Sequence, residues 1–120
     1  HPLPAAEVTV AELLKGKGYA TFAAGKWGLG MFDTPGSPLA QGFDHFFGYN
    51  CQRHAHTHYP TYLYRDAERF PLPGNDGAKG DTFSHDLFEK EALAFLDRQT
   101  GPFFLYLPVT VPHVAVQVPD

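Results

Sequence analysis

The first hydrophobic pattern along the chain is typical of a short helix followed by a buried strand. Thr9 and Glu12 have the spacing of a capping box, which predicts a helix over residues 10–15. The apolar side chains expected on its packed face are Val10, Leu13 and Leu14. The nearly all-apolar residues 19–24 then have the length of a strand that is covered on both sides, as in a parallel sheet.

A second helix and a second strand are predicted in the last third of the chain. Residues 84–99 carry apolar side chains at helical spacing, namely Phe88, Ala92, Phe95 and Leu96. Residues 103–107 are predicted to form a second buried strand. Between the two halves, residues 31–81 are rich in prolines and turn sequences and are expected to be mostly loop, with a short strand over residues 62–65. This order predicts an α/β fold whose ligands bind at the carboxyl ends of the strands.

Length and composition narrow the classes of protein that remain. The 120 residues, 43% of them hydrophobic and 18% charged, fit one ordinary folded domain. The apolar stretches are too short for a membrane-spanning helix, and a net charge of −4 gives no basic surface for nucleic acid or anionic lipid. Twelve glycines, eleven prolines and 15% aromatic residues indicate faces that pack on missing neighbours. We therefore expect residues 1–120 to be a single partial domain, with the oligomeric state left open.

Two candidate functional residues directly follow the predicted strands. Lys26 stands in a glycine-flanked turn after the first strand, and His113 stands in the loop after the second. Both are expected at the same sheet edge, where an ammonium can stabilise an oxyanion and an imidazole can transfer a proton. The glycines around Lys26 match neither a phosphate loop nor a dinucleotide-binding fingerprint, so nucleotide binding is not predicted. The alternative for Lys26 is a solvated side chain.

Histidines are concentrated in one short segment, as His54, His56 and His58. If the segment is extended, the three imidazoles lie on one face and are candidate ligands of a zinc ion. No fourth ligand or supporting carboxylate is evident, so hydrogen-bonded loop histidines are the alternative. Two further histidines and the cysteine are given no functional role. His45 is expected to pack among aromatic rings, His85 to face solvent, and Cys51 to be a small buried side chain.

Four segments, in order and over essentially the whole chain, resemble the sulfatase family of alkaline-phosphatase-like hydrolases. They are residues 18–30 with the Gly-Lys-Trp ending, residues 41–48 with Gly-Phe-Asp, residues 84–88 with the helix that follows, and residues 102–113 with Pro112-His113. The resemblance implies a fragment of an alkaline-phosphatase-like sandwich, with buried and mainly parallel strands, flanking helices and a long loop-rich insertion.

The resemblance also implies a chemistry. In this family a cysteine or serine is converted to formylglycine, which attacks a sulfate ester while a bound calcium polarises the sulfate. The formylglycine signature is absent here and Cys51 does not match it. The nucleophile and the acidic calcium ligands are therefore expected upstream of His1 and downstream of Asp120, with no metal ligand inside the chain and no activity of the fragment alone. A periplasmic or secreted sulfuric ester hydrolase, acting on an aryl or glycan sulfate ester, is what the resemblance implies for the parent.

Individual roles follow by matching positions. Lys26 matches the family lysine that contacts the nucleophile and sulfate oxygens, and His113 matches the histidine that contacts the sulfate and leaving-group oxygen. Many sulfatases have a histidine two residues after the lysine, where this chain has Gly28. We hypothesise that an imidazole of the 54–58 loop replaces it, with His56 as the first choice. The side chains expected on the substrate side are His54, His58, Tyr59 and Arg65. Core packing is the alternative for the tyrosine.

Two other functions stay open. A related phosphoesterase or phosphonate hydrolase shares this framework, and an assay of sulfate against phosphate monoesters separates it from a sulfatase. A non-catalytic metal- or carbohydrate-binding module built on the three clustered histidines belongs to another class. Tight zinc binding measured by calorimetry favours that module.

Overall fold

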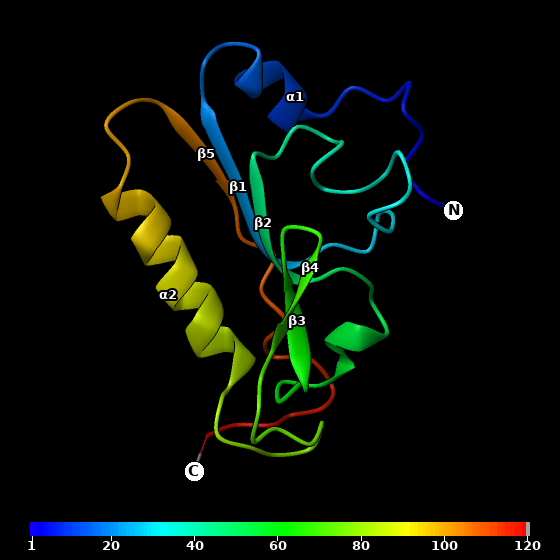
Figure 1. Cartoon of the computed structure of the whole chain (residues 1–120), viewed down its shortest axis with the longest axis vertical. Coiled ribbons are helices and arrows are strands. Elements are labelled where there is room, and N and C mark those ends of the chain that lie inside the picture. The colour runs from blue at the N-terminus through cyan, green and yellow to red at the C-terminus, as the bar shows by residue number, and fades with distance from the viewer. Residues whose placement is uncertain (120) are drawn as a thin grey trace.

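The computed structural model describes residues 1–119, which form a five-stranded mixed sheet with one long helix packed on it (Figure 1). The elements in chain order are α1 (Val10–Lys15), β1 (Ala20–Lys26), β2 (His45–Tyr49), a 3₁₀ helix (His54–His56), β3 (Tyr62–Arg65), β4 (Glu68–Pro71), α2 (Ser84–Asp97) and β5 (Phe103–Tyr106). The strand order is β4-β3-β2-β1-β5. β1 is parallel to both β2 and β5, whereas β3 and β4 extend the sheet in antiparallel fashion. The predicted α/β class with mainly parallel central strands is confirmed.

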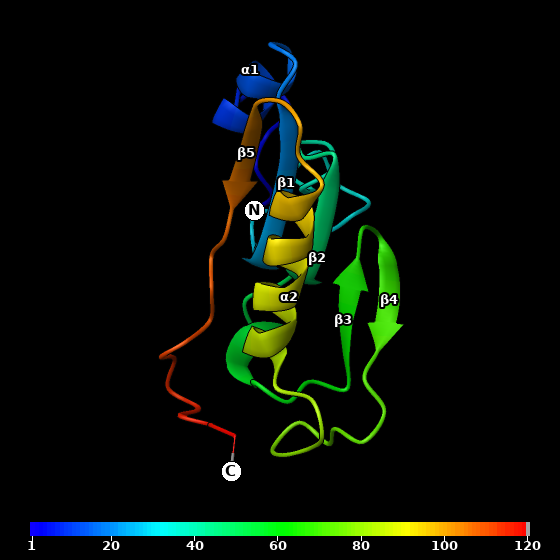
Figure 2. The same ribbon diagram turned by 90° about the vertical axis from the view of Figure 1, so that its left-hand side faces the viewer.

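The core lies on both faces of the central strands, because side chains alternate along them. On one face, Phe22 and Phe47 pack against Phe88 and Phe95 of α2, which crosses in front of β1 and β2 in Figure 2. The second hydrophobic cluster contains Ala11, Ala23, Trp27, Phe43 and Phe46. The two clusters explain why β1 is almost continuously apolar.

Helix α1 has the predicted bounds, but its packed face differs from the prediction. The capping box is present, with hydrogen bonds of 2.7 and 3.2 Å between its two residues. Only Ala11 is buried, whereas Val10 and Leu13 stay 57% and 61% exposed. The reason is a close approach of Gly42, whose Cα lies against the helix backbone at residues 11–12. A small side chain fits there, and the larger ones face away.

The second predicted pair of elements is only partly as expected. Phe88, Ala92 and Phe95 of α2 are buried, but Leu96 is 38% exposed. The last strand is not buried: β5 lies at the sheet edge, next to β1 alone, and Phe103 is 43% exposed. None of the helices formed by residues 1–119 combines the length and apolar character needed to cross a bilayer.

Two strands lie in the region that was predicted to be mostly loop. The short strand over residues 62–65 is confirmed as β3, but β2 and β4 were missed. β2 is the parallel neighbour of β1 and therefore a central part of the sheet. Gly48 weakens the strand pattern of β2 in the sequence. The structure requires this glycine, because its φ is +152° and a Cβ there would run into the carbonyl oxygen of Gly25.

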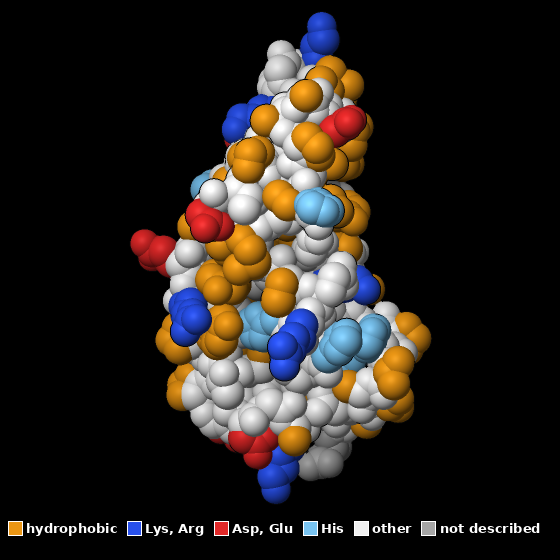
Figure 3. Space-filling model, turned by 90° about the vertical axis from the view of Figure 1, so that its right-hand side faces the viewer, with side chains coloured by type: hydrophobic (Ala, Val, Ile, Leu, Met, Phe, Trp, Pro, Cys, Tyr) orange, Lys and Arg blue, Asp and Glu red, His pale blue; other side chains and the backbone are white. Residues whose placement is uncertain are grey.

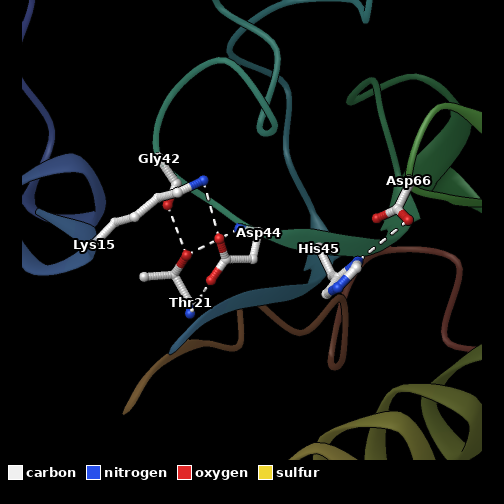
Figure 4. Close-up of polar contacts among 6 residues, drawn as sticks. All are labelled: Lys15, Thr21, Gly42, Asp44, His45 and Asp66. Carbon is white, nitrogen blue, oxygen red and sulfur yellow. Dashed lines mark hydrogen bonds and ion pairs between the residues drawn. The ribbon is translucent and has the colours of Figure 1, made fainter. Parts of the chain in front are cut away.

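The amino ends of β1 and β2 are joined to α1 by one carboxylate (Figure 4). Asp44 accepts a hydrogen bond of 3.0 Å from the backbone N–H of Thr21 and forms an ion pair of 2.9 Å with Lys15. These contacts give the Gly-Phe-Asp segment a structural role. The neighbouring His45 does not pack among aromatic rings as predicted, because its imidazole is largely exposed and lies 3.3 Å from the carboxylate of Asp66.

Candidate active site

The carboxyl ends of β1, β2 and β5 point toward the same end of the molecule, the lower end in Figures 1 and 2. Lys26 is the last residue of β1, and its backbone N–H donates to the carbonyl of Pro108, 3.0 Å away. Trp27 donates in the same way to the carbonyl of Tyr49, at 2.9 Å. Pro108 belongs to the segment that leaves β5 and continues to His113. The structure therefore brings the segments that carry Lys26 and His113 to one edge of the sheet.

His113 and His56 form a stacked pair of imidazoles at this edge. Their ring centroids are 4.9 Å apart and the ring planes are inclined by 24°. His56 is exposed, whereas His113 is half-buried and its Nδ1 has no hydrogen-bond partner among the described residues. The pair joins the two long loops that follow β2 and β5. Because a neutral imidazole carries one donor and one acceptor nitrogen, each of the two rings is able to give or take up a proton at a group bound beside it.

The extended arrangement that would place the three clustered histidines on one face is not found. The segment His54–His56 forms a 3₁₀ helix rather than an extended strand, so its residues do not alternate. The ring centroid of His54 lies 4.4 Å from that of Tyr62 and 5.0 Å from that of Tyr49. Burial lowers the pKa of His54. Within residues 1–119, no group of three or more His, Cys, Asp or Glu side chains is arranged to hold a metal ion.

His58 lies in the interior, although it was expected on the substrate side. It is 1% exposed, and its Nδ1 lies 3.2 Å from the hydroxyl oxygen of Thr110. Its backbone N–H donates to Oε1 of Gln117, 2.7 Å away. Burial lowers the pKa of His58, and the charges of His113 and His85 act in the same direction. A side chain so enclosed holds other segments and does not present itself to a ligand.

Tyr59 and Arg65 also have structural partners. Tyr59 is 7% exposed and packs with its ring centroid 5.5 Å from that of Phe83, as in the core alternative. Both terminal nitrogens of Arg65 contact the carboxylate of Glu91 on α2, at 2.9 and 2.6 Å. The guanidinium also lies over the ring of Phe47, 4.8 Å from its centroid. In this structure the guanidinium of Arg65 thus pairs with Glu91, and its contact with a substrate anion stays a prediction.

A cleft of about 350 Å³ opens where the chain leaves β1 and β2. Its lining residues are His1, Pro2, Gly28, Gly30, Met31, Thr34, Asn50, Cys51 and Gln52. Cys51 is therefore half-buried in a cleft wall and not fully buried as predicted. Gly28 has a φ of +81°, and the Gln52 side chain lies against it where a Cβ would otherwise project.

Sequence reasoning missed several residues at this edge. Gln52, Thr110 and Gln117 make their contacts across long sequence separations, which no local pattern reveals. Gly28 was recognised as the place of an absent family histidine, but nothing in the sequence indicated that Gln52 fills the space beside it. His85 was expected in solvent but is half-buried, with its Nδ1 enclosed and its ring 6.3 Å from that of Phe83. Figure 3 shows histidine, lysine and arginine side chains gathered on the lower half of one face.

Sequence comparisons with known proteins point to one family. The family model described as Sulfatase matches residues 1–120. An N-acetylgalactosamine-6-sulfatase from Sus scrofa is 36% identical over 128 residues, which are 95% of this chain and 24% of the relative. An arylsulfatase from Klebsiella aerogenes is 32% identical over 125 residues, with 93% and 25% covered. The chain thus spans a quarter or less of the length of these curated relatives.

Solved structures give the same result for the fold. Ps i-CgsB in complex with k-i-k-neocarrahexaose superimposes with a TM-score of 0.83 at 25% identity, over 100% of this chain and 30% of that one. A protein in complex with its substrate D-glucosamine-2-N,6-O-disulfate gives a TM-score of 0.67 at 26% identity, over 94% and 20%. The predicted fragment of an alkaline-phosphatase-like sandwich is confirmed. Since the family model extends over the whole sequence, the chain belongs to the sulfatase family.

Proposed function

We propose that residues 1–120 are the central part of the catalytic domain of an enzyme that hydrolyses sulfate esters. The observation that carries the proposal is the meeting of the β1 end with the segment after β5. It sets Lys26 at the edge where His113 stacks on His56. In open α/β sheets, ligands bind at the carboxyl ends of parallel strands, and this edge is such a place.

Lys26 and His113 have side chains whose chemistry suits sulfuryl transfer. The ammonium of Lys26 stabilises the negative charge that is spread over the sulfuryl oxygens in the transition state. The imidazole of His113 contacts the oxygen of the leaving alcohol and donates a proton to it as the sulfur–oxygen bond breaks.

His56 is proposed as the base that replaces the family imidazole absent at Gly28. The space next to Gly28 is taken by the carboxamide of Gln52, which does not accept a proton at neutral pH. His56 is exposed and stacks on His113, so its imidazole is free to act on a bound group. His56→Ala in the full-length protein tests this assignment, with His54→Ala and His58→Ala for comparison, and near-native turnover of His56→Ala contradicts it.

The nucleophile and the metal are proposed to come from other parts of the full-length protein. Membership of the family suggests a metal cofactor, and we propose calcium, which polarises the sulfate when bound. The residues described here do not fit such a site, because no cluster of three ligating side chains exists within residues 1–119. The formylglycine is likewise assigned to a segment outside this chain. The parent protein is proposed to act in the periplasm or outside the cell.

A glycan sulfate ester is the proposed substrate class. Two observations support it: a curated relative is named for N-acetylgalactosamine 6-sulfate, and a similar structure was solved with a disulfated glucosamine. The test is hydrolysis by the full-length protein of matched sulfate and phosphate monoesters. Release of sulfate at a higher kcat/KM supports the proposal, whereas preferential release of phosphate favours the related phosphoesterase. Tight zinc binding with no hydrolysis of either ester supports the binding module.

A further inference from the structure

His58 is the point where three separate segments of the chain meet. Its imidazole contacts the hydroxyl of Thr110 at 3.2 Å, and its backbone N–H donates to Gln117 at 2.7 Å. Its carbonyl accepts the N–H of Ser84, the first residue of α2, at 2.9 Å. The side chain itself is 1% exposed. His58 is thus a buried junction between the loop after β2, the start of α2 and the segment after β5.

The segment after β5 is fixed on both sides of His113. Before it, Thr110 contacts His58 through its hydroxyl and accepts the N–H of His113 through its carbonyl, at 3.0 Å. After it, Gln117 contacts His58 and donates from its Nε2 to the carbonyl of Ala78, at 2.8 Å. No regular helix or strand holds this segment within the described residues, so these side-chain contacts determine where the imidazole of His113 lies.

We propose that His58 is a positioning residue for His113: by holding Thr110, its imidazole keeps the ring of His113 stacked on His56. This inference rests on the proposed function, in which His113 protonates the leaving group. His58 contacts no substrate and acts only through the segment that it holds. The role differs from the substrate contact expected from the sequence.

The chemistry of the junction suits a neutral histidine. Burial and the neighbouring histidines lower the pKa of His58, so the ring is uncharged at neutral pH and has one donor and one acceptor nitrogen. The hydroxyl of Thr110 is able to complete either role, because it both donates and accepts. Thr110 is 4% exposed, so water does not compete easily for this contact.

Three variants of the full-length protein test the contact. Thr110→Val removes the hydroxyl with almost no change of shape, and His58→Phe removes the nitrogen. His58→Asn keeps a polar group near the position of Nδ1. We expect the first two to lower kcat by about 10- to 100-fold with a small change in KM, because a displacement of about 1 Å has effects of this size. The double variant Thr110→Val/His58→Phe should lose no more than the worse of its two single variants. His58→Asn should keep most of the wild-type kcat.

The leaving group provides the sharper readout. If His113 is displaced, protonation of the leaving oxygen is impaired, so the loss in Thr110→Val should be larger for alkyl sulfates than for nitrophenyl sulfates. A general loss of folding would lower both rates equally. Thermal unfolding of each variant serves as the control, and Thr110→Val carries the test if His58→Phe does not fold.

The outcomes separate this inference from the function on which it rests. A native kcat in Thr110→Val, together with a large loss in His113→Ala, contradicts the role of His58 and leaves the proposed function standing. A native kcat in His113→Ala contradicts the proposed function itself. Equal losses on good and poor leaving groups in Thr110→Val also overturn the positioning role.

Discussion

At the scale of single residues, the histidines of this chain differ mainly in their contact with water. His54 packs between tyrosine rings, His58 is enclosed, and His56 is exposed beside His113. The sequence could indicate that imidazoles are abundant near one sheet edge, but not which of them face solvent. That distinction depends on the 3₁₀ helix and on Thr110 and Gln117, which are remote in sequence.

The buried histidines predict a loss of folding stability on acidification. Burial lowers the pKa of His54 and His58 below the value of about 6.5 that an unfolded chain has. Their contribution to stability is therefore fully present above that pH and is lost as the pH falls toward their pKa values in the folded protein. We expect His54→Phe, which keeps an aromatic ring and removes the titration, to weaken this pH dependence.

The measurement is urea unfolding of the full-length protein between about pH 7 and pH 5. The free energy of unfolding of His54→Phe should fall less over this range than that of the wild type. Leu93→Gln is the control, because Leu93 is 53% exposed and its replacement adds and removes no titrating group. Identical slopes for His54→Phe and the wild type contradict the assignment.

At the scale of elements, the sequence predicts those that depend on local contacts. Helix α1 has its capping box, and the bounds of β1 agree closely with the prediction. β2 was missed because its register depends on β1: Gly25 and Gly48 are paired, and their backbones approach closely. The exposure of β5 likewise follows from its place in the sheet and not from its own composition.

The close approach of β1 and β2 predicts a large effect of one methyl group. Gly48→Ala places a Cβ against the carbonyl of Gly25 in a backbone conformation that favours glycine. We expect the free energy of unfolding to fall by about 3 kcal/mol or more. Chemical denaturation of the full-length protein measures it. Gly101→Ala is the control, since a Cβ there meets nothing within 4 Å, and equal stabilities of the two variants would falsify this account.

Asp44 predicts a different kind of instability, in acid. Burial alone raises the pKa of Asp44, but hydrogen bonds from Thr21 and the charge of Lys15 together lower it. The stability that Asp44 supplies is therefore present above about pH 3.9 and is lost as the pH falls through its lowered pKa. Asp44→Asn should reduce stability by about 1 kcal/mol near neutral pH and flatten the acid limb of the unfolding curve. An unchanged acid limb contradicts this role.

At the scale of the whole molecule, the two ends of the sheet have different tasks. The amino ends are joined by the Asp44 contacts, whereas the carboxyl ends carry the loops with Lys26, His56 and His113. The parallel direction of β1, β2 and β5 is what separates the Asp44 contacts from the residues of the proposed site. Exposed apolar side chains on α1 and β5 add a surface that local patterns assigned to the core.

The most direct test of the proposed site is the kcat/KM of Lys26→Ala and His113→Ala variants of the full-length protein for a sulfate ester that the wild type hydrolyses. Lys90→Ala on the exposed side of α2 and His45→Ala at the amino end of β2 are the matched controls. We expect both site variants to lose about 100-fold or more, and both controls to stay within about twofold of the wild type. Near-native kcat/KM in either site variant contradicts the assignment of sulfate ester cleavage to this edge.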